Sequence, residues 1–469
     1  MTVPGVLGPT ATCRAGSSAW TLPGRMRASL PSKGPSRPRV IGAPNDQAWH
    51  YARSSRVLAR QQQRSDASPI EAYALRVAVR DSRRQQFLSA WSVPPPTYVP
   101  MLKRTLKQSL PVNVAEASPQ VWSGADMAKD KGQWCYSMTP QEADELRSAV
   151  ATALERLESS GRGLAEITRS DFNVPQFGTR LAGFRHEIAA GQGFMVIKGV
   201  PVREMDAVEQ SAAWLGIASH IGTPVSQNKM GHVLGHVADH GEDPNDPTVR
   251  TYRTPQKHRF HTDSCDVVGL LCINSALTGG LSSIASSWSV YREMQVRQPQ
   301  LLAELEAELY WDRKGEVGEG EKPYYKGAVF NANTRGQLLT IYDRGFFETA
   351  HRHGVPPLTT TQTAAMDLFE EIADELKLDM ELEPGDIQLL HNHQILHSRT
   401  AYTNHATDPT RQRHLMRLWL SFNHDDGVGW ELPPSFRDGR YKNTDRSNGV
   451  PVGGILSAGP SASVPLGKR

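Results

Sequence analysis

The chain has 469 residues, enough for one large domain with extensions or for two ordinary domains. Its net charge of +3 is unevenly distributed, because residues 1–119 carry 17 Lys and Arg against 5 acidic residues and residues 120–469 carry 35 against 44. A mildly acidic body argues against nucleic acid as a partner, since phosphate binding needs a basic face. No apolar run approaches the roughly 20 residues of a membrane-spanning helix, so no membrane partner is predicted.

The N-terminal part has an unusual composition. Residues 1–45 contain no acidic residue, six basic residues and many Ser, Pro and Gly. This resembles a mitochondrial transit peptide, but its prolines would interrupt the amphipathic helix that such a peptide needs. We therefore predict a disordered basic extension over residues 1–118, with a short helix at 72–87. Four cysteines without paired spacing indicate a reducing, cytoplasmic compartment, with mitochondria as the alternative.

The folded domain is predicted over residues 119–435, followed by a flexible tail at 436–469. It begins with a helix whose start is a capping box, since Thr139 precedes Pro140 and Glu142 stands three positions after Thr139. Apolar periodicity and helix-breaking residues predict four further helices, at residues 180–190, 206–221, 289–297 and 361–376. They also predict a strand at residues 194–200. Many strands with irregular helical insertions favour an α+β, mainly β fold: a double-stranded β-helix of the jelly-roll, cupin-like type with flanking helices. A plain α+β sheet is the alternative.

The triplet His261-Thr262-Asp263 is a candidate metal-binding motif. On a strand, residues i and i+2 point to one face about 6.5–7 Å apart, so an imidazole and a carboxylate can converge on one ion. The apolar run at 267–273 predicts that the triplet lies on a strand. A second such triplet begins at His424, the last histidine of the chain, so only the first can start a site completed downstream. Cys265 alternates with the pair and either faces the metal or is a small buried residue.

A third ligand must come from another strand. Residues 383–386 form a turn before a strand that begins at Ile387, and His391, His393 and His397 follow within a few residues. The residues alone make these three histidines equal candidates. Two imidazoles and one carboxylate leave open coordination positions, which suits Fe(II) and oxygen activation better than a closed structural zinc site, although ligand type alone also permits zinc.

A last strand is predicted at 411–420. There Arg413 and Arg417 share a face with Leu415 and Trp419. Arginines that face inward among apolar residues need an anion, which is either a ligand or a structural carboxylate. Strand rise separates the two arginines by roughly 13 Å, so we expect them to contact different anions.

Residues 122–430 resemble the taurine dioxygenase-like (TauD/TfdA) family of Fe(II)- and 2-oxoglutarate-dependent oxygenases. The matching landmarks are residues 193–200, 260–263, 279–282, 384–386, 392–397 and 413–417. The resemblance implies that His261, Asp263 and His397 bind iron. It further implies that Arg413, assisted by Ser282, binds the distal carboxylate of 2-oxoglutarate, and it places Arg417 where some members bind an anionic primary substrate.

The chain departs from the family pattern in two places. The stretch between the third ligand and the arginines is lengthened at 404–409, and Ser282 stands where threonine is expected, with Ser283 as a rival. The segment 227–258 precedes the iron-binding strand and could cover the substrate cavity, so Asn228 and His232 are candidate substrate contacts. His232 and His236 lie four apart, but nearby glycines argue against a helix and hence against a second metal site.

The implied function is that of a 2-oxoglutarate-dependent non-haem iron dioxygenase. It would use Fe(II), 2-oxoglutarate and O2 to hydroxylate a small anionic substrate, with C–S or C–O cleavage as a further outcome, and would release succinate and CO2. Asp263 favours hydroxylation, since related halogenating oxygenases lack the ligand carboxylate. The alternatives are a non-catalytic metal- or ligand-binding protein on the same barrel and a zinc hydrolase. The sequence leaves the substrate and the oligomeric state open, with a homo-oligomer as one alternative.

Overall fold

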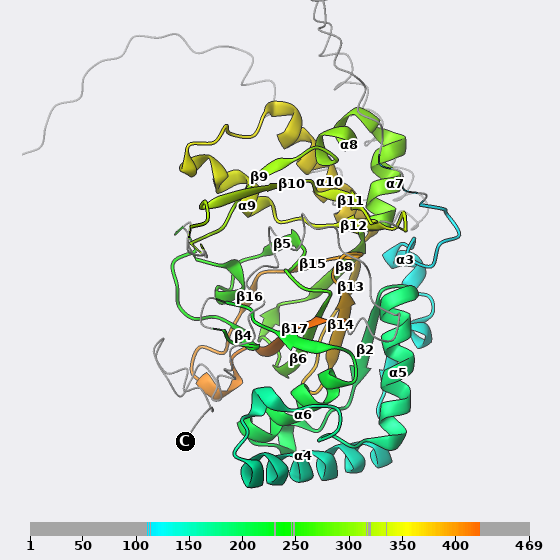
Figure 1. Ribbon diagram of the computed structural model, residues 1–469, viewed down its shortest axis with the longest axis vertical. Coiled ribbons are helices and arrows are strands. Elements are labelled where there is room, and N and C mark those ends of the chain that lie inside the picture. The colour runs from blue at the N-terminus through cyan, green and yellow to red at the C-terminus, as the bar shows by residue number, and fades with distance from the viewer. Residues whose placement is uncertain are drawn as a thin grey trace, which may run out of the picture. The chain divides into compact units, whose positions relative to one another are not determined.

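Two β-sheets face each other in the described part of the chain, and helices cover the outer face of each (Figure 1). The computed structural model describes residues 110–422, except residues 111, 113, 229, 230, 245, 247, 248, 316, 318, 319 and 334. These residues all belong to one structural unit, Leu102–Arg469. The predictions for the helix at 72–87, most of the basic extension and the tail at 436–469 lie outside the described residues.

Seven strands form the larger sheet of the described region. Their order is β1 (Cys135–Ser137), β2 (Phe194–Lys198), β14 (Ile387–His391), β6 (Val267–Asn274), β17 (His414–Ser421) and β3 (Thr223–Val225), and β4 (Leu234–Ala238) also pairs with β17. β1 and β2 are parallel, and the other pairs are antiparallel. Every residue of β14 is buried, because helices cover one face of this sheet and the smaller sheet covers the other.

The smaller sheet has four strands within the same residues. Their order is β13 (Leu378–Met380), β8 (Ser282–Ser286), β15 (Ile395–Arg399) and β5 (His258–His261), all antiparallel. Three pairs of strands complete the β-structure: β9 (Leu309–Asp312) with β10 (Tyr324–Gly327), β11 (Phe330–Ala332) with β12 (Leu338–Thr340), and β7 (Thr278–Gly279) with β16 (Tyr402–Thr403). The two facing sheets form the predicted double-stranded β-helix.

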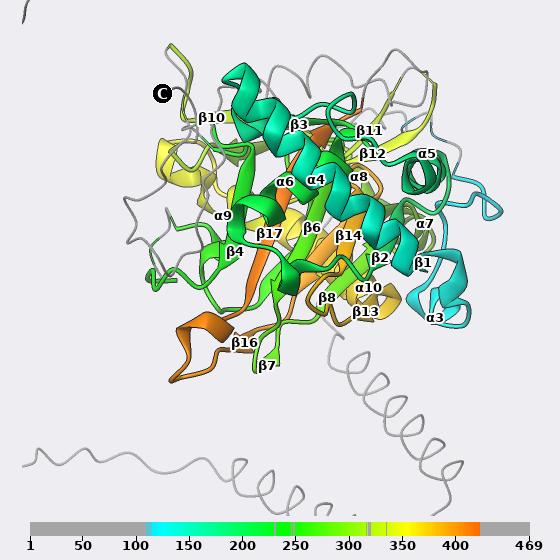
Figure 2. The same ribbon diagram turned by 90° about the horizontal axis from the view of Figure 1, so that it is seen from below.

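The helices cover the two sheets from opposite sides (Figures 1 and 2). Those packed on the larger sheet are α4 (Pro140–Ser160), α5 (Pro175–Ala190) and α6 (Ala207–Ser219), and those packed on the smaller sheet are α7 (Ser287–Arg297), α8 (Pro299–Leu305) and α10 (Thr360–Leu376). The short helices are α3 (Gly124–Met127), α9 (Arg344–Thr349), η1 (Lys131–Gln133), η2 (Leu164–Glu166), η3 (Val202–Glu204), η4 (Thr251–Arg253), η5 (Ala350–His353) and η6 (Pro409–Arg411). No helix of the described residues is both long and apolar enough to cross a membrane.

Most predicted elements are present with shifted ends. The capping box of α4 forms as predicted, since the Thr139 hydroxyl accepts from the Glu142 N–H and the Glu142 carboxylate accepts from the Thr139 N–H. The strand predicted at 194–200 ends at Lys198, because Gly199 adopts a φ of +93°. Packing also begins before position 119, since residues 110, 112 and 114 contact the core under α7 and α10.

The strand predicted around the His261 triplet is shorter than expected. β5 ends at His261, and the apolar run that follows is not its continuation but β6, in the opposite sheet. Residues 262–266 therefore cross from one sheet to the other. The predicted last strand begins at His414 rather than 411, because η6 occupies residues 409–411 and the Asn404 side chain accepts a hydrogen bond from the Arg413 N–H.

Glycines at helix and sheet contacts offer a test of the packing. A Cβ atom at Gly269 would lie 2.7 Å from the Trp214 indole, where α6 meets β6. We therefore expect Gly269→Ala to lower the free energy of unfolding by about 1–3 kcal/mol. In contrast, a Cβ at Gly183, an exposed position of α5, meets nothing within 4 Å, so Gly183→Ala should raise stability by roughly 0.5–1 kcal/mol. Denaturant unfolding of both variants checks this expectation. Equal changes in the free energy of unfolding would contradict the close packing of Gly269 against Trp214.

Candidate metal centre and active site

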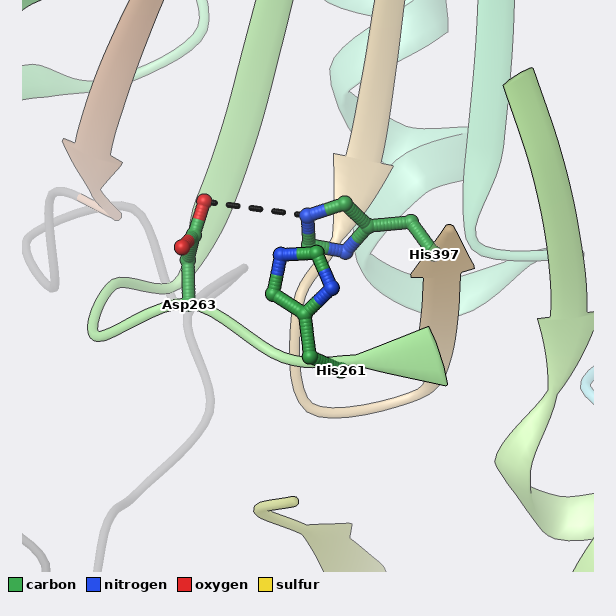
Figure 3. A group of neighbouring side chains, drawn as sticks. All are labelled: His261, Asp263 and His397. Atoms are coloured by element: carbon green, nitrogen blue, oxygen red, sulfur yellow. Dashed lines mark ion pairs between the residues drawn. The ribbon is translucent and has the colours of Figure 1, made fainter. Parts of the chain in front are cut away.

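His261, Asp263 and His397 converge where the two sheets meet (Figure 3). All three are buried, and one ligand atom from each lies within 4.8 Å of the others. His261 ends β5, Asp263 lies in the crossing segment, and His397 lies on β15, where it is the cross-strand partner of His261. The described residues contain no other cluster of three or more His, Cys, Asp or Glu side chains with this spacing. The structure therefore brings together the three residues that the family resemblance implies as ligands.

The tautomer of His261 suits metal binding. Its Nδ1 lies 2.9 Å from the backbone carbonyl of Arg259, which can only accept, so Nδ1 carries the proton and Nε2 presents a lone pair. Burial, with neighbouring His258 and His397, lowers the pKa of His261 well below its usual range. His258 stacks on the same ring at a centroid distance of 3.8 Å. The imidazole is thus neutral and fixed in orientation.

Asp263 is ionised and held from several sides. Burial would raise the pKa of this carboxyl, but the Arg417 guanidinium and the nearby histidines hold it well below its usual range. Arg417 Nη1 lies 3.3 Å from its Oδ2, and Trp419 Nε1 donates to the same oxygen at 2.8 Å. His397 Nε2 lies 3.7 Å away. A carboxylate surrounded by donors can bind a cation without first losing a proton.

The Asn392 side chain fixes the backbone on either side of the Asp263 carboxylate. Its Nδ2 donates to the carbonyls of Asp263 and Cys265, and its Oδ1 accepts from the Asp263 N–H at 2.7 Å. Asn392 lies in the turn that leads from β14 into β15, the strand of His397. Three hydrogen bonds therefore connect the segments that carry the second and third metal-binding candidates.

The other histidine candidates have different surroundings. His393 Nε2 lies 3.0 Å from Asp266, whose carboxylate also accepts from the Phe422 N–H. His391 ends β14 and packs against the Phe422 ring. Cys265 is buried among apolar residues between the sheets and is not part of the ligand cluster, as its role as a small buried residue predicts. Of the three histidines, the structure brings only His397 to the cluster.

Arg413 is a buried cation with an unsatisfied donor. Its side chain is 5% exposed, its Nη2 lies 3.4 Å from the Gly280 carbonyl, and its Nη1 has no partner among the described residues. Such a donor fits an anion that enters the protein from outside, as the resemblance implies for 2-oxoglutarate. Ser282 lies on the inner face of β8 and donates to Gln388, whereas Ser283 points outward to Asp379. This orientation favours Ser282 over its rival.

Arg417 lies beside the metal-binding cluster, on the inner face of β17. Its Nε donates to Gln227 at 2.8 Å, and its Cζ lies 4.7 Å and 4.8 Å from the ring centroids of Tyr252 and Trp419. The amide of Gln227 in turn donates to the Arg417 carbonyl. Gln227 and Tyr252 thus position Arg417, and no periodic pattern marks either, because Gln227 lies outside any helix or strand and Tyr252 lies in the three-residue helix η4.

A cavity of about 320 Å³ opens onto the cluster. Asp263, His261, Arg417 and Asn228 line it, and the remaining lining is rich in cations, namely Arg250, Lys257, Arg259, Arg313, Lys314 and Arg344. His232 is not among the lining residues but lies behind Asn228, with 3.2 Å between its Nδ1 and the Asn228 Nδ2. The contact of His232 with substrate stays a prediction, which would have to act through Asn228. His236 lies instead against His414, with 2.8 Å between ring nitrogens.

Comparison with known proteins agrees with this geometry. Residues 160–419 match the family described as "Taurine catabolism dioxygenase TauD, TfdA family". The chain is 30% identical over 326 residues to FR-33289 synthase of Streptomyces rubellomurinus, covering 68% of this chain and 93% of that protein. It is 30% identical over 314 residues to the taurine hydroxylase-like protein SAT17 of Stachybotrys chartarum, covering 65% and 79%. The solved structure of the oxygenase OrfP with Fe and alpha-ketoglutaric acid is 16% identical, covers 62% of this chain and 94% of that chain, and has a TM-score of 0.47.

The facing sheets and the His-Asp-His cluster define a non-haem iron oxygenase that depends on 2-oxoglutarate. The chain belongs to the taurine catabolism dioxygenase TauD, TfdA family. Its cofactors are iron and the cosubstrate 2-oxoglutarate. The donor set fits iron, because two neutral imidazoles and one carboxylate leave coordination positions open for the cosubstrate.

The choice of third ligand is testable by metal binding. His397→Ala should lower Fe(II) affinity at least about 100-fold, since losing a group that merely orients a ligand already costs about 10–100-fold. His393→Ala should keep the iron stoichiometry but lower the free energy of unfolding by roughly 1–3 kcal/mol, because it leaves Asp266 short of a partner. Anaerobic Fe(II) titration and denaturant unfolding separate the two effects. Loss of iron in His393→Ala alone would mean that the third ligand is misassigned.

Proposed function

We propose that the protein hydroxylates a small anionic organic substrate and releases succinate and CO2, with C–S or C–O cleavage where the hydroxylated carbon bears a leaving group. The observation that carries the proposal is the position of Arg417, whose guanidinium lies next to Asp263 at the wall of the cavity. A cation so close to the metal-binding cluster would hold an anionic substrate with its neighbouring C–H bonds near the iron.

The three clustered side chains have one task in this proposal. His261, Asp263 and His397 hold the metal on one side and leave the cavity side open. When bound, iron and 2-oxoglutarate supply the oxidation of a C–H bond, which the protein's own side chains cannot perform. Arg413 binds the distal carboxylate of the cosubstrate through a charge-assisted contact, possible at its unsatisfied Nη1.

The walls of the cavity determine which substrates enter. Tyr252 and Trp419 pack against Arg417 and keep water from its guanidinium, which strengthens its attraction for an anion. Arg250 also lies near the Trp419 ring, with its Cζ 5.8 Å from the centroid. Asn228 adds a polar amide to the wall. A cavity whose lining contains seven Lys and Arg residues against three aspartates favours carboxylates, sulfonates or sulfates over cationic compounds.

A substrate screen tests the proposal directly. Succinate release from 2-oxoglutarate is measured with small carboxylates, sulfonates, sulfates and, as charge controls, betaines and amines. The anionic compounds should stimulate release, and the cationic ones should not. Stimulation by cationic compounds alone would contradict an anionic substrate.

Replacement of Arg413 and replacement of Arg417 should impair the binding of different ligands. Arg413→Ala should weaken 2-oxoglutarate binding by about 2–5 kcal/mol, as expected for a lost charge pair in a buried site. Arg417→Ala, assayed at saturating iron, should keep 2-oxoglutarate binding and substrate-independent decarboxylation but lose stimulation by the anionic substrate. Arg259→Ala is the matched control, because Arg259 lines the same cavity but lies 3.5 Å from Glu348. If Arg417→Ala instead loses 2-oxoglutarate, the two roles are exchanged.

A further inference from the structure

Two buried guanidiniums lie beside one tyrosine ring. Arg399 ends β15 and is 7% exposed, and Arg413 precedes β17 and is 5% exposed. Their Cζ atoms lie 4.7 Å and 5.1 Å from the centroid of the Tyr402 ring. The family resemblance implies a ligand for Arg413 and none for Arg399 or Tyr402.

The described residues leave hydrogen-bond donors of Arg399, Tyr402 and Arg413 without an acceptor. Arg399 donates to the backbone carbonyls of Thr254, Gln256 and Thr400, but its Nη1 has no partner among the described residues. The same holds for Nη1 of Arg413 and for the Tyr402 hydroxyl. Within those residues, no carboxylate oxygen lies within ion-pair distance of either guanidinium. Three donors are therefore buried together without an acceptor.

An unpaired buried charge is expensive. Removing a guanidinium from water costs several kcal/mol unless an anion or hydrogen bonds compensate, and here two are removed side by side. Burial and, after it, the charge of Arg413 lower the pKa of Arg399 to about 10. A site that holds two such cations with unused donors is complementary to a carboxylate that accepts from several donors at once.

The position of the group matches a cosubstrate that also reaches the metal. His397 and Arg399 are two apart on β15, so both side chains lie on its inner face about 6.5–7 Å apart along the strand. Ser282 is the cross-strand partner of Arg399, and Ile284 that of His397. One strand repeat thus separates the backbone positions of the metal ligand and of Arg399, a spacing on the order of the length of a five-carbon dicarboxylate.

The turn at Gly279 and Gly280 leaves room for the Arg413 side chain. Gly279 and Gly280 both adopt positive φ, and a Cβ at Gly280 would lie 2.8 Å from Arg413 Nε. A Cβ at Gly279 would lie 2.2 Å from the Ala401 carbonyl, next to Tyr402. Side chains at either position would displace the strand pair β7–β16 or the guanidinium. The backbone is therefore shaped around this cluster.

We propose that Arg399 and Tyr402 act together with Arg413 as the binding group for the distal carboxylate of 2-oxoglutarate. Two guanidiniums and one phenol would then donate hydrogen bonds to one carboxylate. The site would therefore discriminate strongly against 2-oxo acids that have no distal carboxylate. The inference rests on the cosubstrate role proposed for Arg413 and adds two residues to it.

Binding measurements on the full-length protein test this without relying on turnover. The anaerobic, Mn(II)-loaded protein is titrated calorimetrically with 2-oxoglutarate and, by competition, with pyruvate, which has the same 1-carboxylate and 2-oxo group but no distal carboxylate. Tyr402→Phe should weaken 2-oxoglutarate binding about 3- to 10-fold, and Arg399→Gln by at least about 30-fold. Pyruvate binding should be unchanged in both, because it does not reach the cluster.

Two results would overturn the proposal. One is wild-type affinity for 2-oxoglutarate in Tyr402→Phe and Arg399→Gln, and the other is an equal loss of 2-oxoglutarate and pyruvate, which marks a structural role. Tyr402→Phe keeps the ring against which both guanidiniums pack, so it decides the matter if Arg399→Gln does not fold. Arg413→Ala in the same titration separates the two proposals: if it also binds 2-oxoglutarate normally, the proposed role of Arg413 fails as well.

Discussion

The hydrogen bonds of the Asn392 amide to the backbone around Asp263 are the interaction on which the metal centre depends. Asp263 lies outside any strand, in the segment that crosses from the smaller sheet to the larger, so no strand pairing fixes its position. Asn392 donates to two carbonyls of this segment and accepts from its N–H, all within the buried interior. Because Asn392 also begins the turn into β15, one side chain sets the position of Asp263 relative to His397.

A second constraint is electrostatic. The interior between the sheets contains one metal-binding carboxylate and several buried cations, which lie in two places. Arg417 contacts Asp263 itself, whereas Arg413 and Arg399 lie beside Tyr402. Buried cations destabilise a fold unless anions accompany them, and among the described residues only Arg417 of these three has a carboxylate within ion-pair distance. Under the roles proposed for Arg413 and Arg417, this arrangement would keep the cosubstrate and the substrate apart, because two anions attracted to one arginine would exclude each other.

The sequence predicted the parts of this arrangement that follow from local patterns. The capping box of α4, the turn before β14 and the inward face of Arg417 with Trp419 all depend on residues close together in the chain. The pairing of His261 with His397 was expected only through family resemblance, because residue patterns left three histidines equal. The structure distinguishes these histidines, because the His393 ring contacts the Asp266 carboxylate and not the metal-binding cluster.

The remaining features depend on contacts between distant loops, which no periodicity records. The strand expected through Asp263 stops at His261, because the chain must cross between sheets there. Gln227 and Arg417 are far apart in sequence and meet through side-chain hydrogen bonds. The cluster of Arg399, Tyr402 and Arg413 likewise joins β15, β16 and the start of β17 across a lengthened loop. Residue types alone could not assign these contacts.

Fe(II) affinity of an Asn392→Ala variant, measured by anaerobic titration, tests the central claim most directly. Asn333→Ala is the control, because Asn333 is also buried and makes several side-chain hydrogen bonds, but in the turn between β11 and β12. If the Asn392 amide positions Asp263, Fe(II) affinity falls by about 10–100-fold in Asn392→Ala and stays at the wild-type value in Asn333→Ala. Wild-type Fe(II) affinity in a folded Asn392→Ala protein would contradict the account.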